Sequence, residues 1–511
     1  MSTAVGREHA LGAERAGLAW LGRMAATACY AMLALVVIGA LFEGWLLILL
    51  NQYFADAPIV GGAGPDTIVR GLRNAAYIAL GVSAMVVVAR KGTLRQFLKP
   101  VDMAFAALLG ALLLAALAGE SSLTLTAHGI FVYIRGAIVF YAVRALAPTW
   151  TSARVLVLIV LSILIVFVGV AFAQVYLGAP VYNLLGLTDL TWANQHRAQA
   201  LLSHPNHLGH VAGLALLGVL AVDGSQRRRR WWLLFGVLAL GLALSQSRES
   251  LVAAIVGIVG LAVVYAGRRR TVILALAMVV GITAVTWTLQ PGSWEALAQK
   301  IRGVISAVEV PSGQVPAQPC DPGLEECTPQ GIPSRSIRVL YYQQGVALWL
   351  KSPLLGYGVG QFGGGVASQH NPEWYKNARF GPDGFDLHNF EATQVDSFWL
   401  HLLVETGAVG SAAYLLWLGS IGLLPARRAW RSWKQPAGEA RRQLPDIPRA
   451  LDRYVPAALL FACLIAGLSP ALEDPVFGPL LFGGLGLAWG MRASDPARDG
   501  DQPAARPAAD T

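Results

Sequence analysis

Long apolar runs separated by short polar connections recur along most of the chain. A helix needs about 20 mostly apolar residues to cross the hydrocarbon core of a bilayer, and about a dozen runs approach that length. They lie at residues 25–50, 73–90, 101–118, 128–147, 154–177, 207–223, 231–246, 249–266, 271–290, 398–424, 454–470 and 476–492. The pattern predicts an all-α polytopic membrane protein with about 12 transmembrane helices.

Basic residues follow an alternating pattern in the connections between these runs. Lys and Arg are dense near Arg90, at 227–230, at 268–270 and over 427–453. The intervening connections, at 119–129, 178–206, 246–250, 291–397 and 469–475, are poor in Lys and Arg for their length. Cytoplasmic loops carry the excess of Lys and Arg in membrane proteins. We therefore expect both termini in the cytoplasm and the sparsely basic connections on the opposite, non-cytoplasmic side of the membrane.

Residues 291–397 form a segment too long to be a simple connector, because loops beyond about 12–15 residues are usually functional or disordered. Aromatic residues such as Trp374, Tyr341 and Tyr342 favour an ordered subdomain here. We expect five parts: a cytoplasmic N-terminal tail, a bundle of about nine helices, a large periplasmic loop subdomain, C-terminal transmembrane helices and a disordered cytoplasmic tail. Their boundaries are 1–24, 25–290, 291–397, 398–492 and 493–511.

Composition agrees with the membrane interpretation. Of the 511 residues, 55% are hydrophobic and 14% charged, whereas about a quarter of a soluble domain is charged. The net charge of +9 is explained by the basic connections, so no nucleic-acid partner is expected. Cys29 and Cys463 lie in apolar runs and are expected to be packing residues. Cys320 and Cys327 flank a Pro-Gly turn and are candidates for a disulfide in an oxidising compartment.

Ionisable side chains at the expected periplasmic surface are candidates for function, since such groups are costly near hydrocarbon. The first cluster contains Arg197, His204, Asn206 and His207 at the start of a span. It has three interpretations: helix capping and polar packing, contacts with a substrate, or a metal bound by His207 and His210 one helical turn apart. We expect no metal, because no carboxylate accompanies these imidazoles in the sequence.

Two further clusters contain arginine. Arg248 lies in the turn SQSRES, where it either extends to the membrane interface or holds a phosphate with its five N–H donors. Arg335 and Arg338 precede a helical stretch that ends in PLLGYGVG. The glycines of that turn allow a ligand to approach the backbone closely, but a simple turn would need no ligand at all.

The fourth cluster lies where the chain re-enters the membrane after the long loop. It contains His388, Asp396, His401 and Glu405. A carboxylate or an imidazole at this position is suited to act as a general base. The alternative is that Asp396 caps the helix together with Ser397 and that Glu405 faces the interior of the bundle.

Taken in order, four segments resemble the O-antigen ligase and polymerase superfamily of bacterial envelope glycosyltransferases. They are SHPNHLGH, SQSRES, Arg338 followed by GYGVG, and VDSFWLHLLVETGAVG, within residues 195–425. The resemblance implies a GT-C-like enzyme of the bacterial inner membrane that needs no cofactor and no metal. It also implies a donor glycan on undecaprenyl pyrophosphate, an acceptor that is a glycan or the lipid A core, and inversion at the anomeric carbon.

The resemblance also implies roles for single residues. Arg248 and Arg338, supported by Arg197 and Arg335, would stabilise the pyrophosphate leaving group. Independently of the resemblance, His204, Asn206 and His207 are the possible substrate contacts of the first cluster. The family has a His-Asn-Ser-like motif where this chain has Val395-Asp396-Ser397, and His388 lies eight residues earlier. We therefore favour Asp396 over His388 as the base.

The same departure favours a polymerase of surface polysaccharide over an O-antigen ligase that transfers glycan to the lipid A core. A protein O-oligosaccharyltransferase is a third possibility within the family. A polysaccharide transporter or flippase is the alternative from a different class, and it would place polar residues in the middle of the spans. Here they gather at one face, which favours an enzyme at the membrane surface.

Overall fold

The computed structural model describes residues 2–54, 64–222, 229–264, 269–290, 298, 334–382, 384–385, 394–434 and 447–493. Within the described residues, each apolar run of the sequence coincides with one helix, apart from one or two residues at some ends. These helices are α1 (Ser2–Phe54), α2 (Pro65–Lys91), α3 (Pro100–Ala118), α4 (Leu123–Leu146), α5 (Trp150–Leu177), α8 (Pro205–Ala221), α9 (Arg229–Ser245), α10 (Arg248–Val264), α11 (Arg269–Thr288), α15 (Phe398–Lys434), α16 (Ile447–Leu468) and α17 (Phe477–Ala493).

Further helices lie between these. They are η1 (Leu94–Phe97), α6 (Ala179–Leu184), α7 (Thr191–Asn194), α13 (Ser334–Lys351), α14 (Gly365–His370), η4 (Trp374–Lys376) and η5 (Ala378–Phe380). The described residues contain no β-strand. The all-α prediction is therefore confirmed.

Eight of the helices are long and apolar enough to cross a membrane, by length and composition. The described parts of α8, α9 and α10 have 17 residues each, and α17 is a shorter apolar helix. A helix of 17 residues is about 26 Å long, close to the hydrocarbon thickness of about 30 Å. The polytopic membrane fold is confirmed, whereas the number of 12 spans stays a prediction.

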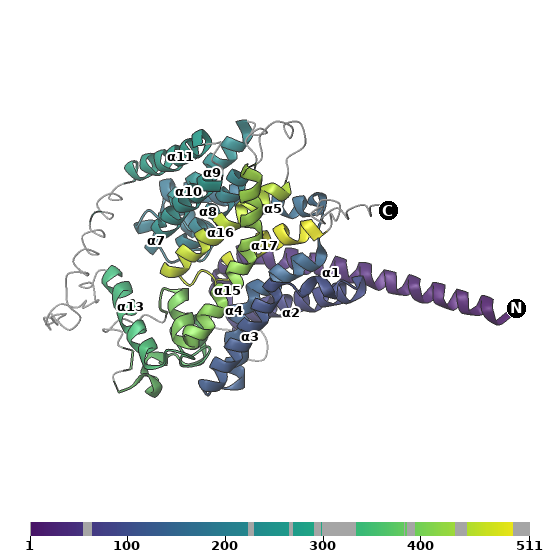
Figure 1. Cartoon of the computed structure of the whole chain (residues 1–511). Helices are drawn as coiled ribbons and strands as arrows, with labels where there is room; N and C mark the ends of the chain where they lie inside the picture. The colour runs from purple at the N-terminus through teal and green to yellow at the C-terminus, as the bar shows by residue number, and fades with distance from the viewer. Residues whose placement is uncertain are drawn as a thin grey trace, which may run out of the picture.

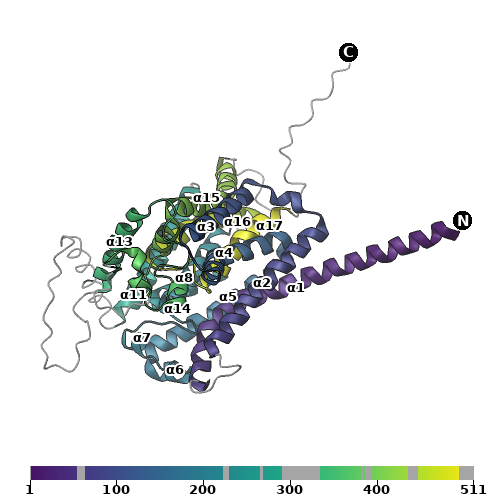
Figure 2. The same cartoon turned by 90° about the horizontal axis from the view of Figure 1, so that it is seen from below.

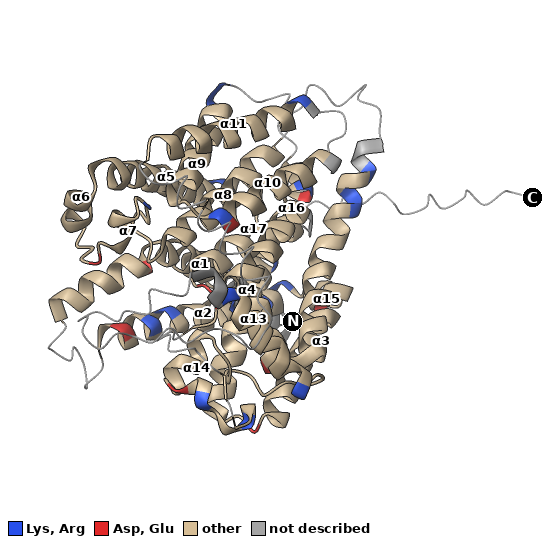
Figure 3. Ribbon diagram, turned by 90° about the vertical axis from the view of Figure 1, so that its left-hand side faces the viewer, with Lys and Arg blue, Asp and Glu red and all other residues tan. Residues whose placement is uncertain are grey.

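The apolar helices pack into one bundle around a continuous core. Among the contacting pairs are α1 with α2, α4 with α17, α3 with α15, and α10 with α16. Figures 1 and 2 show the N-terminal part of α1 extending beyond the other helices, so the expected N-terminal tail and the first span form one continuous helix. Most of the helical ribbon carries neither Lys or Arg nor Asp or Glu (Figure 3), as the composition of membrane-spanning helices requires.

The described part of the long loop has a small core of its own. Its ring of aromatic side chains surrounds Phe362, whose centroid lies 5.2 Å from Trp374 and 5.2 Å from Phe385. Tyr341 and Leu348 of α13 are buried in the same cluster. This core explains why the described part of the long loop is ordered, and Leu400 and Val404 of α15 complete it.

A glycine-rich turn fixes this segment to the bundle. The N–H groups of Tyr357 and Gly358 donate to the carbonyl oxygens of Val404 and Glu405 at 3.0 and 2.9 Å. α15 changes direction at Gly407, which has φ +62°, and a Cβ there would lie 2.3 Å from the backbone of Leu354. Only glycine fits this crossing. The turn thereby sets the position of α13, and with it Arg338, above the helices.

Candidate active site

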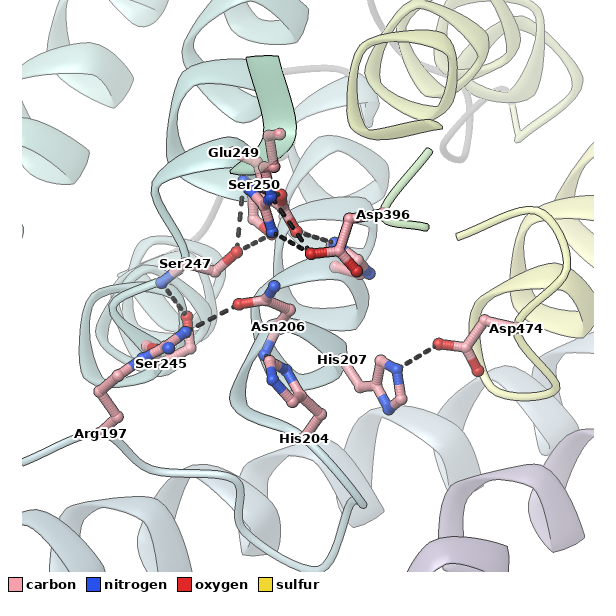
Figure 4. A network of polar contacts seen from close by, with 12 residues as sticks. Arg197, His204, Asn206, His207, Ser245, Ser247, Glu249, Ser250, Asp396 and Asp474 are labelled. Carbon is pink, nitrogen blue, oxygen red and sulfur yellow. Dashed lines mark hydrogen bonds and ion pairs between the residues drawn. The ribbon is translucent and has the colours of Figure 1, made fainter. Parts of the chain in front are cut away.

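Five parts of the chain meet at one end of the bundle and bring their polar side chains together. They are the segment before α8, the turn between α9 and α10, α13, the turn before α15 and the connection between α16 and α17. Figure 4 shows the network of contacts among them. The side chains predicted from separate motifs therefore share one region.

Arg197 is held by three contacts in this region. Its Nε donates to the carbonyl of Ser245 at 3.3 Å, and its Nη2 donates to the side chain of Asn206 at 2.8 Å. The indole ring of Trp192 lies 5.0 Å from its guanidinium carbon. Burial lowers the pKa of Arg197 to about 10, and the charge of Arg248 contributes next. Arg197 is thus a preorganised cation next to a second one.

The turn that carries Arg248 has unusual backbone geometry. Gln246 has φ +50°, and His196, on the facing segment, also has φ +50°. The amide of Gln246 donates to the carbonyl of His196 at 3.1 Å, which joins the two segments. Residues with side chains rarely adopt this backbone conformation, and it concentrates at functional sites. Arg248 follows at the first position of α10, and its charge acts on Arg197.

Small residues allow α8 to approach this turn closely. A Cβ on Gly209 would lie 2.7 Å from Ser247, 2.8 Å from Ser250 and 2.9 Å from Ser245. The hydroxyls of Ser247 and Ser250 are hydrogen-bonded at 2.7 Å. Glycine and serine at helix contacts are typical of closely packed membrane helices. This contact places Asn206, at the start of α8, next to the turn that carries Arg248.

Arg338 forms the central ion pair of the site. Its Nε and Nη2 donate to one oxygen of Asp396 at 3.2 and 3.0 Å, and its Nη1 lies 3.6 Å from Glu249. Burial opposes the charge of Arg338, but Asp396 and Glu249 outweigh it and raise the pKa of the guanidinium. Its side chain is still 34% exposed and that of Asp396 is 46% exposed. This pair therefore remains open to a ligand.

Glu249 links the arginines to the bundle interior. Its carboxylate lies 3.1 Å from Nε2 of His210, which is fully buried. The side chain of Glu249 is 4% exposed, so its charge must be compensated by the protein. Arg338 and His210 provide that compensation from opposite sides of the carboxylate.

Two further histidines, His204 at the N-cap of α8 and His207 within α8, have different partners. His204 caps the helix, because its Nδ1 accepts from the N–H of Asn206 at 3.0 Å. Burial, with the charge of His207, lowers the pKa of His204 to about 2, so this imidazole stays neutral. Nε2 of His207 lies 2.6 Å from Asp474, which belongs to the connection before α17. Figure 4 shows His207 pointing toward that carboxylate.

These pairs correct one premise of the sequence analysis. Asp474 and Glu249 accompany His207 and His210, although no carboxylate lies near them in the sequence. Among the described residues, no group of three His, Cys, Asp or Glu side chains lies close enough together to hold a metal ion. The carboxylates pair with imidazoles one to one instead.

The capping alternative is confirmed for Ser397 and wrong for Asp396. The hydroxyl of Ser397 accepts the N–H of Leu400 at 3.2 Å and therefore caps α15. The same hydroxyl is hydrogen-bonded to Tyr342 at 2.7 Å, and the Tyr342 hydroxyl also donates to the carbonyl of Gly467. Asp396 is left to pair with Arg338, and Tyr342 connects α13 to α15 and α16.

The phosphate-binding interpretation of the glycine-rich turn does not agree with its contacts. The N–H groups of Gly360 and Phe362 donate to the carboxylate of Glu405 at 2.8 and 2.9 Å. Tyr133 donates to the same carboxylate at 2.8 Å. Glu405 is 3% exposed, which agrees with the expectation that it faces the interior. These backbone donors have a protein acceptor and serve the fold.

Several predicted residues lie elsewhere. His401 is buried within α15, with Nδ1 2.9 Å from Glu473. Arg335 lies in α13, but its side chain is outside the described part of the structure. His388, Cys320 and Cys327 also lie outside the described residues. Neither the alternative base nor the disulfide is tested.

Glu249 and Asp474 belong to the site, although the sequence patterns did not identify them. Glu249 directly follows Arg248, and Asp474 lies in the connection SPALEDP. Both were visible as acidic residues at the entrance to an apolar run, where an ionisable group suggests function.

The comparison with known families adds to this geometry. Residues 233–415 match the family model described as O-antigen ligase. The chain carries a domain of the O-antigen ligase family. No curated protein was found to match the sequence of this chain. The O-antigen ligase domain includes Arg248, Glu249, Arg338 and Asp396, whereas Arg197 precedes it. The matched domain supports a membrane enzyme of the O-antigen ligase and polymerase type. The arginine cluster, formed by Arg197, Arg248 and Arg338, lies largely within that domain.

Proposed function

We propose that this protein is a GT-C-like glycosyltransferase that extends a surface polysaccharide on its lipid carrier at the periplasmic face of the inner membrane. The donor is a glycan linked to undecaprenyl pyrophosphate, and the acceptor is a second glycan. The observation that carries the proposal is the exposed ion pair between Arg338 and Asp396, next to Arg197 and Arg248. It combines an anion-binding group and a potential base in one contact.

The cationic part of the site suits a pyrophosphate. Guanidinium groups bind phosphate oxygens through paired N–H donors and stay charged at any physiological pH. In the proposed complex, the pyrophosphate oxygens take the place of Asp396 on Arg338. Arg248 and Arg197 add positive charge where the leaving group gathers negative charge.

The exchange has a second effect, because it releases the carboxylate of Asp396. That carboxylate then takes the proton of the acceptor hydroxyl while the hydroxyl oxygen attacks the anomeric carbon. The bond from that carbon to the pyrophosphate oxygen breaks, and its electron pair leaves with undecaprenyl pyrophosphate. Attack opposite to the leaving group inverts the anomeric centre. The mechanism uses these side chains and assigns no step to a metal.

Arg338→Ala tests the donor site, with Arg95→Ala as the matched control. Arg95 is an exposed arginine of η1 and lies outside the cluster. We expect Arg338→Ala to lower glycan extension by about 10²–10³-fold, the usual cost of removing one donor that stabilises transition-state charge. Both variants should be present in membranes at normal levels. Normal extension by Arg338→Ala would refute the assignment.

The glycan profile of a strain that lacks the protein distinguishes the polymerase from its closest alternative. Loss of a polymerase leaves single repeat units on the lipid A core or on the carrier. Loss of an O-antigen ligase leaves long glycan on the carrier lipid. Loss of glycan from protein hydroxyls would instead indicate a protein O-oligosaccharyltransferase. Asp396 stands where the family has a histidine, and this difference favours the result expected for a polymerase.

A further inference from the structure

The bundle contains a large apolar cavity that the proposed reaction does not use. Its volume is about 1160 Å³, and it lies between α5, α8, α9, α16 and α17, with α1 at one side. Its walls are mostly aliphatic, such as Leu161, Leu214 and Leu487. Gly218 and Gly483 are part of its wall and bring no side chain into it.

The position of the cavity along α8 separates it from the arginine cluster. α8 begins beside His204 and Asn206, whereas the cavity is lined from Val211 to Val222. At 1.5 Å per residue this stretch covers about 16 Å, which is about half of a hydrocarbon core of roughly 30 Å. The cavity therefore has the depth of one leaflet, on the side away from the site.

The outer rim of the cavity is basic and aromatic. Trp150 and Arg154 line it from the start of α5, and Arg230 and Trp231 line it from the start of α9. Both arginines are exposed. Tryptophan is enriched at the membrane interface, and a guanidinium group is suited to a phosphate. The rim thus has the chemistry of a lipid headgroup site.

We propose that this cavity binds an anionic phospholipid of the leaflet opposite to the active site. One acyl chain fills the space between α5, α8 and α17, and the phosphate of the headgroup lies on Arg154 and Arg230. The polyprenyl chain of the donor suits the cavity less well, because its pyrophosphate would bind near Arg338 at the other end of α8. The phospholipid proposal does not depend on the proposed reaction.

The test is lipid retention by the full-length protein, measured by native mass spectrometry. The protein is exchanged into mild detergent with phosphatidylglycerol or phosphatidylcholine of identical acyl chains. We expect preferential retention of phosphatidylglycerol. The double variant Arg154→Ala/Arg230→Ala should lower that preference roughly tenfold or more, since each arginine near a membrane surface contributes about 1 kcal/mol toward an anionic lipid.

A cavity-filling variant tests the acyl-chain part of the proposal. Ala215 is half-buried on the cavity wall, and Ala215→Phe should reduce retention of both lipids. Ala107→Phe is the control, because Ala107 is exposed on α3. Equal retention of the two lipids by the unmodified protein would overturn the proposal. So would retention of a polyprenyl phosphate in their place, or an Arg154→Ala/Arg230→Ala protein with unchanged preference.

Discussion

The arginine cluster and the glycine-rich turn both have sequences suggestive of phosphate binding, but their contacts are of different kinds. Arg338 contacts Asp396 through side chains that are 34% and 46% exposed. The turn contacts Glu405 through the N–H groups of Gly360 and Phe362, and that carboxylate is 3% exposed. A side-chain ion pair at a surface can exchange one partner for a ligand at little cost. Backbone donors bound to a buried carboxyl group cannot, since opening them leaves buried polar groups without hydrogen-bond partners.

This difference in contacts distinguishes the functions of the two motifs. The arginine cluster is expected to control the reaction without being needed for folding. The glycine-rich turn is expected to control folding without touching the donor.

The largest effect is expected from Asp396→Asn, which keeps the shape of the side chain but removes the base. General-base catalysis contributes about 10²–10⁴-fold, so turnover should fall by that factor while thermal stability in detergent changes little. His388→Ala measured in the same assay is the comparison, because His388 is the alternative base. If neither variant lowers turnover, both assignments are wrong.

The second prediction concerns the glycine-rich turn. Gly360 has φ +79°, and a Cβ there would lie 3.0 Å from both Leu125 and Val366. Gly360→Val should therefore lower the free energy of unfolding by about 2–3 kcal/mol, measured by thermal unfolding in detergent. Gly39→Val is the control, because a Cβ at Gly39 meets nothing within 4 Å. A Gly360→Val protein of normal stability that no longer binds donor would make the turn a phosphate site after all.

The third prediction is a pH dependence of stability. Burial opposes the charge of Asp474, but His207 and the N–H of Val476 lower its pKa from 3.8 to about 2. A depressed carboxyl pKa stabilises the folded state above pH 3.8, and this contribution disappears as the pH falls toward 2. Asp474→Asn should cost about 2 kcal/mol at pH 7. The stability difference from the unmodified protein should shrink steadily below pH 4, and a constant difference would contradict the assignment.

The smallest effect is expected from Glu249→Gln. Glu249 competes with the donor for Arg338, from which it lies 3.6 Å away, and glutamine retains a hydrogen-bonding group for His210. Removing the negative charge should lower the KM for the lipid-linked donor by roughly three- to tenfold, since a partly buried charge pair at this distance is only partly screened. A higher KM would show that Glu249 assists donor binding instead.

The sequence was sufficient to predict the helices, because the length and apolarity of a membrane span are local properties. It was also sufficient to predict that Arg197, Arg248 and Arg338 lie on one side of the membrane, since alternate connections must emerge on the same side. It was not sufficient for the pairs that join distant segments. His207 and Asp474 are 267 residues apart, and no local pattern specifies such a contact. The role of Glu405 was hidden for the same reason, because its partners lie on α4 and in the glycine-rich turn.

The contact between Arg338 and Asp396 also bears on product release. In the proposed reaction Asp396 ends each cycle protonated, and undecaprenyl pyrophosphate remains on the arginines. Once Asp396 loses its proton to water, its restored charge competes again for Arg338, at the 3.0 Å separation of the ion pair. The carboxylate that begins the chemistry would thus help to expel the spent carrier and limit inhibition by product.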